Sequence, residues 1–385
     1  MKLKYMFLFL VPAFAAAQNS VDGYVAEIVA NNPELRASRA AAAAEVINRV
    51  AENRLEATEV GFAYKWPSMV GEVTKLEFEV TQAFDWPGAY GARRRATSAA
   101  RRALDARAVA DERDLKLKAR SLMCELVCAN QRVAMLDAIV ANLDSLHNAM
   151  HLMLEKGEST ELDHRKLRLE EVAMKQQLTD ATRQRSETLA AIAVLNGGEL
   201  PAGIADLSEY GVEELHPLEE YLAAADLEGA ALDAAADAQE LDARAERLGL
   251  APGFSLGYVM EKEGPVVYNG FSVGLRLPEY GAGKRAEAAR LEASALRIQA
   301  ENARAQRRTE ITDNYEAAVG ARRLLADYDH AFGKDYIALL QRALNGGAMS
   351  YIDYFNELNF YLSARLEYLS VQLTYRSLLS ALPLR

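Results

Sequence analysis

Apolar and polar side chains alternate in four short segments of this 385-residue chain, grouped in two pairs. A period of two predicts β-strands with one apolar and one polar face. Each segment has about 9–12 residues, the length of a tilted strand that crosses a bilayer. The apolar positions are Val60, Phe62, Tyr64 and Trp66; Leu76, Phe78, Val80, Phe84 and Trp86; Phe254, Leu256, Tyr258 and Met260; and Val267, Phe271, Val273, Leu275 and Leu277.

Two interpretations of these strands stay open: membrane strands, or soluble hairpins packed on helices. Glu77 and Glu79 lie on the polar face and suit a watery lumen. Four strands cannot close a barrel in lipid, where open edges are not tolerated. Membrane strands therefore require several copies of the chain. Three copies would give twelve strands, although the hydrogen-bond argument does not fix the number. Aromatic residues near the segment ends are candidates for the membrane interface, namely Trp66, Trp86, Tyr258 and Tyr268.

Long stretches without Pro or Gly follow each strand pair and predict very long helices. One lies between Gly91 and Gly157 and another between Gly157 and Gly197; residues 285–332 contain only Gly320, and residues 349–382 contain neither. Their Ala-, Leu-, Arg- and Glu-rich composition is typical of extended coiled-coil packing. The order of helix, strand pair and long helices thus occurs twice, with matching landmarks about 190 residues apart. Such a period indicates a duplicated architecture.

The first residues have the order of a secretory signal peptide, here assigned to residues 1–17. Lys2 and Lys4 precede an apolar stretch, and small residues end at Ala17. Beyond them we expect no apolar run of about 18 residues and therefore no membrane helix. A net charge of −11 argues against nucleic acid as a partner. Cys124 and Cys128, one helical turn apart, are expected to be buried thiols, because that spacing suits a disulfide badly.

Three short motifs occur in order along the chain, and the last two occur in duplicate. They are Asn32-Pro33-Glu34-Leu35 near the start; Trp86-Pro87…Gly91…Arg93 and Leu277-Pro278…Gly283…Arg285 after each strand pair; and Gly157…Ser159…Asp163 and Gly347…Ser350…Asp353. With the signal peptide and the repeat, they make the mature chain resemble the outer-membrane efflux protein family, the TolC-like channels. The resemblance implies a homotrimer with a 12-stranded β-barrel in outer-membrane lipid, continued by a periplasmic α-helical barrel. It also implies docking to a periplasmic adaptor protein and an inner-membrane pump.

The resemblance divides the mature chain into two repeats and a linker. The first repeat is 18–196, with a β-hairpin at 58–86 and a helical tip near 157. The linker 197–217 would form an equatorial layer. The second repeat is 218–385, with a β-hairpin at 252–278 and a tip near 347.

The same resemblance assigns roles to residues of the two tips. Gly157, Ser159, Gly347 and Ser350 would form the turns where the adaptor docks. Asp163 and Asp353, expected about two turns into the returning helices, would form a channel constriction that attracts cations. An alternative role for both carboxylates is interaction with a helix dipole. The acidic position that the family often has one turn later is Lys166 and Asn356 here.

A weak metal candidate lies before the first tip. His147 and His151 have i, i+4 spacing, and Glu155 follows on the same face. Asn148 stands where a metalloprotease would hold its glutamate, and an ordinary helix face is the alternative. His164, His216 and His330 show no ligand spacing. We find no catalytic constellation and no cofactor motif, so an enzyme is not expected.

The function expected from these features is a passive outer-membrane exit channel of a tripartite efflux or type I secretion system, located in the cell outer membrane with a periplasmic extension. The alternative is a soluble periplasmic coiled-coil adaptor or scaffold protein. The lipid-suited alternation of all four strands favours the channel, because a scaffold would not need it.

Overall fold

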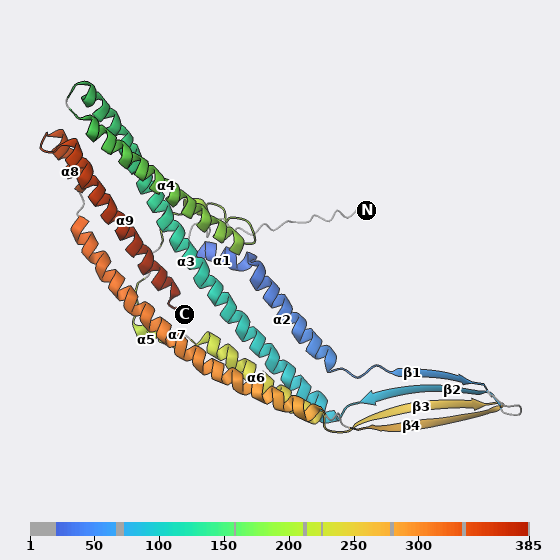
Figure 1. The fold of residues 1–385 in the computed structure, drawn as a ribbon. Helices are drawn as coiled ribbons and strands as arrows, with labels where there is room; N and C mark the ends of the chain where they lie inside the picture. Colours follow the sequence, from blue (N-terminus) through green and yellow to red (C-terminus); the bar gives the residue numbers. More distant parts are fainter. Residues whose placement is uncertain are drawn as a thin grey trace, which may run out of the picture. The chain divides into compact units, whose positions relative to one another are not determined.

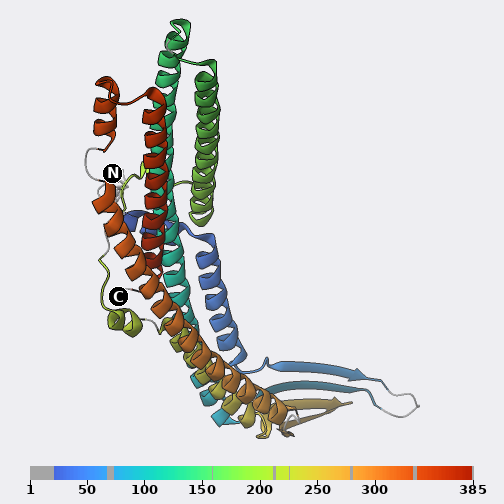
Figure 2. The same cartoon turned by 60° about the vertical axis from the view of Figure 1, so that its left-hand side comes forward.

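The computed structural model describes residues 21–66, 73–157, 159–210, 214–224, 226–277, 281–332 and 336–383. The expected signal peptide, 1–17, lies outside the described residues. The chain is mainly helical with one antiparallel sheet (Figures 1 and 2). In chain order the elements are α1 (Val21–Asn31), α2 (Pro33–Glu52), β1 (Glu59–Lys65), β2 (Lys75–Phe84), α3 (Pro87–Glu155), α4 (Glu161–Leu195), a 3-10 turn (Ile204–Asp206), α5 (Leu218–Ala223), α6 (Leu227–Leu248), β3 (Gly253–Glu263), β4 (Val266–Arg276), α7 (Ala282–Phe332), α8 (Tyr336–Asn345) and α9 (Tyr351–Ala381).

The chain forms two compact units. The sheet unit comprises residues 37–111 and 226–307, and the hairpin unit comprises residues 1–36, 112–225 and 308–385. Each unit therefore contains segments of both predicted repeats. The helix–hairpin–helix order does occur twice, as α2-β1-β2-α3-α4 and α6-β3-β4-α7-α8-α9.

The sheet unit contains a single four-stranded sheet in the order β1-β2-β3-β4, with every neighbouring pair antiparallel. β2 pairs with β3 along its whole length, so the sheet joins the two repeats directly. The β3–β4 connection is a tight turn, because Glu263 already pairs with Val266. Gly264 makes this turn at φ 55°, a conformation that favours glycine.

The start of α2 shows the cap chemistry expected from Asn32 and Pro33. The Asn32 Oδ1 accepts a hydrogen bond of 2.8 Å from the Leu35 amide, and its Nδ2 donates to the Leu195 carbonyl at 2.9 Å. Pro33 occupies the first helical position, where no amide hydrogen is needed. A buried polar side chain thus links α2 to the end of α4 within the hairpin unit.

The described part of the hairpin unit contains three apolar clusters. Residues of α1, α3 and α4 form the first, including Ile28, Met123 and Ile192; residues of α3, α4, α8 and α9 form the second; and residues of α5, α7 and α9 contribute to the third, including Tyr221 and Ile311. By length and composition, one stretch within Pro87–Asp144 is apolar enough to cross a membrane. The expectation of no helix of this kind was therefore wrong by this measure. Buried side chains of α3 belong to the first two clusters, among them Leu126 to the first and Leu136 to the second.

Cys124 and Cys128 are free and buried in α3, as the sequence predicted. A hydrogen bond with Cys128, together with burial, raises the pKa of the Cys124 thiol. This thiol therefore stays protonated and packs as a small apolar group.

Candidate functional site

The register of the sheet gives it one apolar and one polar face. Directly opposed residues of antiparallel strands point to the same side. Val60, Val80, Tyr258 and Phe271 form one cross-strand row. The four separately alternating segments therefore place their apolar side chains on one common face.

The apolar face is strongly exposed. Phe271 is 89% exposed, Val273 77% and Phe62 67%. A soluble protein rarely leaves a contiguous apolar surface of this kind without a partner, which is a lipid or another protein. A polar residue on this face, Asn269, is paired, because the Tyr258 hydroxyl donates a 2.7 Å hydrogen bond to its Oδ1.

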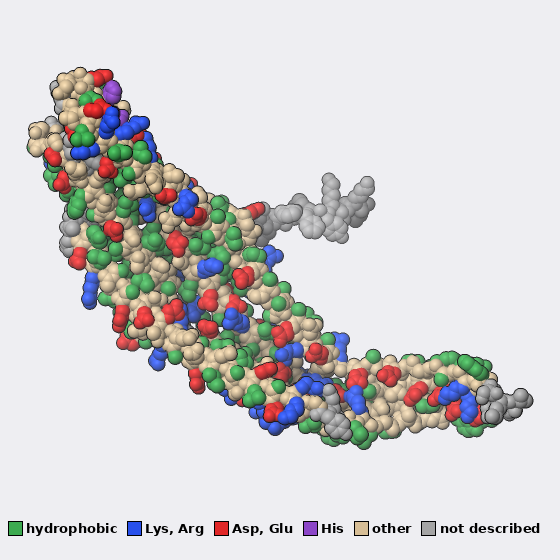
Figure 3. All heavy atoms as spheres, in the orientation of Figure 1, with side chains coloured by type: hydrophobic (Ala, Val, Ile, Leu, Met, Phe, Trp, Pro, Cys, Tyr) green, Lys and Arg blue, Asp and Glu red, His purple; other side chains and the backbone are tan. Residues whose placement is uncertain are grey.

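The opposite face carries charges and small residues. In one row Ala63, Glu77, Glu261 and Tyr268 are opposed. Ion pairs join Lys65 to Glu77 at 2.7 Å, and Lys75 to Glu263 at 3.1 Å and Glu261 at 3.7 Å. Figure 3 shows acidic and basic side chains along the sheet on the side turned to the viewer. These charges would be costly in lipid and are suited to water.

Glycines at two positions of this polar face leave space for the side chains of neighbouring strands. A Cβ added to Gly257 would lie 2.4 Å from the Ser272 Oγ and 2.8 Å from the Thr81 Oγ1, and one added to Gly274 would lie 2.4 Å from the Ser255 Oγ. Larger residues at these positions would displace their neighbours.

Of the four aromatic residues predicted at the membrane interface, two follow the ends of strands. Trp66 follows β1 at the end of the sheet near the β1–β2 and β3–β4 connections, and Trp86 follows β2 at the end near the helices. Tyr258 instead lies in the middle of β3 on the apolar face. Tyr268 lies on the polar face opposite Glu261, which corrects its assignment. The alternation in β4 places odd-numbered residues on the apolar face.

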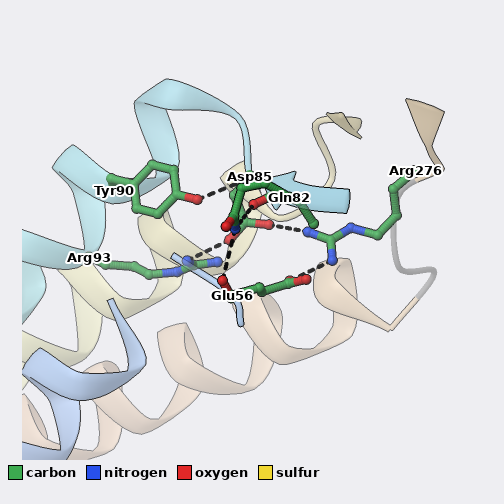
Figure 4. Close-up of polar contacts among 7 residues, drawn as sticks. Glu56, Gln82, Asp85, Tyr90, Arg93 and Arg276 are labelled. Carbon is green, nitrogen blue, oxygen red and sulfur yellow. Dashed lines mark hydrogen bonds and ion pairs between the residues drawn. The ribbon is translucent and has the colours of Figure 1, made fainter. Parts of the chain in front are cut away.

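An ionic network joins the strands to the helices within the sheet unit (Figure 4). The Arg276 guanidinium donates to Glu56 and Asp85, and Arg93 donates to the Asp85 Oδ2 at 2.7 Å. The Asp85 amide donates to the Tyr90 hydroxyl at 2.9 Å. Residues before β1, after β2 and at the end of β4 are therefore held together where both hairpins leave the helices.

This network lines an open polar cleft of about 1090 Å³ in the sheet unit. Arg49, which also lines the cleft, makes a bidentate contact with Asp242 at 2.9 and 3.0 Å and so ties α2 to α6. Sequence patterning identified Arg93 only as part of a turn motif. The partners of Arg276 are 191 and 220 residues away in the chain, so no local spacing indicated them.

The two predicted tips are turns with left-handed glycines. Gly157 has φ 77° between α3 and α4, and Gly347 has φ 70° between α8 and α9. The Gly157 amide donates to the Leu154 carbonyl at 3.0 Å, and the Gly347 amide donates to the Leu344 carbonyl at 3.1 Å. Only glycine adopts this conformation without strain, which explains the repeated residue.

Asp163 and Asp353 lie in the first turn of their helices. This corrects the expectation from the sequence, which placed them about two turns into the helices. Thr160 caps α4, and its Oγ1 accepts from the Asp163 amide at 3.2 Å while donating to the Asp163 carboxylate at 2.6 Å. Ser350 and Asp353 repeat this arrangement at α9, with distances of 3.1 and 2.7 Å. Each carboxylate thus accepts a hydrogen bond from the capping hydroxyl in the first turn of its helix, a position suited to interaction with the helix dipole, which is the alternative that the sequence left open.

The other tip serine, Ser159, has a different environment from Ser350. Its Oγ is buried and has no hydrogen-bond partner among the described residues, whereas Ser350 is a helix cap.

The structure adds a third histidine to the predicted pair near the first tip. His164 of α4 faces both residues of α3, with ring centroids 4.7 Å from His147 and 5.9 Å from His151. Figure 3 shows histidine side chains near this end of the helical hairpin. The described residues contain no group of three or more His, Cys, Asp and Glu side chains arranged to hold a metal ion, so His147, His151 and Glu155 are not a ready-made site.

Solved structures with the same arrangement of elements are outer-membrane proteins. The open state of the MtrE outer membrane channel of Neisseria gonorrhoeae aligns with TM-score 0.74 and 16% identity, over 94% of this chain and 88% of that chain. VceC of Vibrio cholerae, an outer membrane protein, aligns with TM-score 0.72 and 14% identity over 94% of both chains. The CmeC outer membrane channel of Campylobacter jejuni gives 0.71 and 14%, over 94% and 84%.

The chain therefore has the fold of outer-membrane channels built from a helical domain and strand hairpins. Within that class, the resemblance to the TolC-like outer-membrane efflux proteins that the motifs predicted is confirmed at the level of the fold. No protein-family model and no curated protein matches the sequence.

Proposed function

We propose that this protein is the outer-membrane exit channel of a tripartite efflux or type I secretion system. Three copies would each contribute four strands to a 12-stranded barrel, with the helices extending into the periplasm. The observation that carries the proposal is a sheet with one exposed, mainly apolar face, an ion-paired polar face and two open edges. Lipid would cover the first face and water the second.

The open edges support closure between copies. Within the described residues, β1 and β4 each have a neighbour on one side only. Unpaired backbone groups in lipid cost several kcal/mol each, so a membrane sheet must close. Because β1 and β4 are antiparallel in this four-stranded order, β4 of one copy can pair with β1 of the next in the same antiparallel manner.

The internal repeat indicates the register of the seam, which is the expected pairing of β4 of one copy with β1 of the next. β2 is the last strand of the first repeat, and β3 is the first strand of the second repeat. In the next pair of repeats, the equivalent strands are β4 of one copy and β1 of the next copy. Transferring the β2–β3 register through the repeat places Phe62 opposite Leu275 or Leu277 of the next copy. Both choices pair apolar with apolar residues and continue the lipid-facing surface.

The helical tips would dock to the periplasmic adaptor, which connects the channel to its inner-membrane pump. Gly157 and Gly347 support this role as tight turns at the ends of helical hairpins. The channel itself would be passive, with energy supplied by the pump.

Asp163 and Asp353 would also form an acidic constriction at the tips when three copies surround an axis. Replacing both with Asn removes six carboxylates per trimer while retaining a side chain that can accept the capping hydrogen bond. Reduced cation selectivity in single-channel recordings would support the constriction. Unchanged selectivity and conductance would leave the carboxylates with their role in the first turn of the helix alone.

The channel is tested by purification in mild detergent, mass determination and planar-bilayer recording on the same sample. A trimer that opens ion-conducting pores supports the proposal. A water-soluble species that does not insert into bilayers contradicts it and would return the periplasmic scaffold as the working hypothesis.

A further inference from the structure

The histidine cluster of the α3–α4 hairpin has more buried polar atoms than hydrogen bonds to satisfy them. His147 Nδ1, His164 Nε2 and Glu171 Oε2 are buried and have no hydrogen-bond partner among the described residues. Leaving such an atom unpaired costs about 1–3 kcal/mol. The His147 Nδ1 and the Glu171 Oε2 lie 3.7 Å from each other, so the atom of this cluster that is open to another species is the His164 Nε2.

Carboxylates lie near two of the imidazoles, beyond hydrogen-bond distance. The His147 Nδ1 lies 3.7 Å from the Glu171 Oε2, and the His151 Nδ1 lies 3.7 Å from the Glu155 Oε1. A metal-bound histidine commonly turns its other ring nitrogen toward such a carboxylate. The nitrogen of His147 and His151 that could bind a metal is therefore Nε2. In His164 the nitrogen without a hydrogen-bond partner is also Nε2.

The ring spacing fits a shared ion. With a metal–nitrogen bond of about 2.0–2.1 Å, the metal lies roughly 3.2 Å from each ring centroid, so two rings at a tetrahedral angle have centroids about 5.2 Å apart. The observed separations of 4.7 and 5.9 Å lie on either side of this value. Three imidazoles are also a known ligand set for zinc.

A buried carboxylate, that of Glu171, lies beside His147. Glu171, only 5% exposed, receives a 2.6 Å hydrogen bond from Lys175 and has Arg168 at 3.8 Å. Hydrogen bonds to Glu171 and Asp144 raise the pKa of Lys175, which keeps it cationic. Glu171 is thus balanced by cations and is better placed to orient His147 than to bind the metal.

We propose that His147, His151 and His164 bind a divalent transition metal such as Zn²⁺ through their Nε2 atoms, cross-linking α3 to α4 beside the first tip. His147 and His164 form the core pair, and His151, whose side chain is 56% exposed, turns inward to complete the set. This rotation is needed because the described side chains do not yet enclose a metal position. Glu171 and Glu155 act as positioning residues.

The test is calorimetric titration of the full-length protein, carrying no histidine tag, with ZnCl₂. We expect one Zn²⁺ per chain, with binding at least tenfold weaker in His164→Ala and in His147→Ala. His216→Ala is the matched control, because His216 also faces a glutamate at i+4, Glu220 at 3.5 Å, but belongs to no such cluster. Circular dichroism checks folding, and His164→Gln replaces His164→Ala should the latter not fold.

Two further readouts separate ligation from a structural effect. Co²⁺ should give the visible absorption of a tetrahedral site in wild type and not in His164→Ala. Lowering the pH from about 7.5 to about 5.5 should release the metal, because an imidazole must be neutral to bind a metal ion and protons compete for its nitrogen. Absence of saturable binding, or binding unaffected by His164→Ala, would overturn the proposal. None of these measurements depends on whether the protein forms a channel.

Discussion

Replacing Phe271 with lysine tests the orientation of the sheet most directly. Phe271 lies at the centre of β4, on the apolar face, and is 89% exposed. In lipid, a lysine at the midplane of a strand destabilises a barrel by about 2–4 kcal/mol per chain. Such a loss lowers the folding equilibrium constant about 30- to 700-fold. In water, the same substitution at an exposed site changes stability by no more than about 0.5 kcal/mol.

Tyr268→Lys provides the matched control. Tyr268 is in the same strand and is 55% exposed, but it lies on the polar face opposite Glu261. A lysine there remains in water beside a carboxylate, so we expect a change within about 0.5 kcal/mol. The two variants add the same charge to the same strand and differ in the face that carries it.

The assay is urea-induced unfolding in phospholipid vesicles, followed by tryptophan fluorescence. The two tryptophans of the chain, Trp66 and Trp86, follow the ends of β1 and β2 and report on the sheet. Equal stability of Phe271→Lys and wild type would refute a lipid-facing apolar surface. Equal destabilisation by both lysine variants would refute the assignment of the two faces.

Three further changes test the seam, the junction and the tip. In a chain without its native cysteines, Phe62→Cys should form a disulfide between copies with Leu275→Cys or Leu277→Cys; preferential cross-linking to Gly274→Cys would contradict the register. Arg276→Ala should lower the free energy of unfolding by about 1 kcal/mol, because its two ion pairs are partly exposed, with Arg276→Lys intermediate; an unchanged urea midpoint would contradict a stabilising junction. Gly157→Val should leave the trimer mass unchanged but weaken adaptor binding by up to about tenfold, because a β-branched residue at φ 77° is strained. Dissociation of the trimer would argue against a peripheral tip.

Local patterns were sufficient for much of the fold. The period of two in Val60–Tyr64 and in the other three segments located the strands and their apolar face, because side-chain direction in a strand follows from position alone. The glycine turns and the Asn32–Pro33 helix start were predictable for the same reason, since each depends on a few neighbouring residues.

The errors concern contacts that depend on pairing or on element ends. Tyr268 was assigned by its closeness to a segment end, but the odd-numbered positions of β4 face lipid in the proposed barrel. Asp163 was placed too far into α4 because its helix starts only at Glu161, after the Thr160 cap. His164 has no second histidine at helical spacing in its own helix and meets His147 across the hairpin. Residue spacing does not encode such contacts.

The division of the chain into units that each draw on both repeats has a consequence for how the molecule arose and assembles. Neither repeat is a self-contained body, and the β2–β3 pairing makes the same kind of seam inside one chain that β4 and β1 would make between chains. Along the barrel the chain is therefore equivalent to two fused subunits. The proposed trimer would have pseudo-sixfold symmetry, and a half-length ancestor with a single hairpin would have needed six copies to close the same twelve strands.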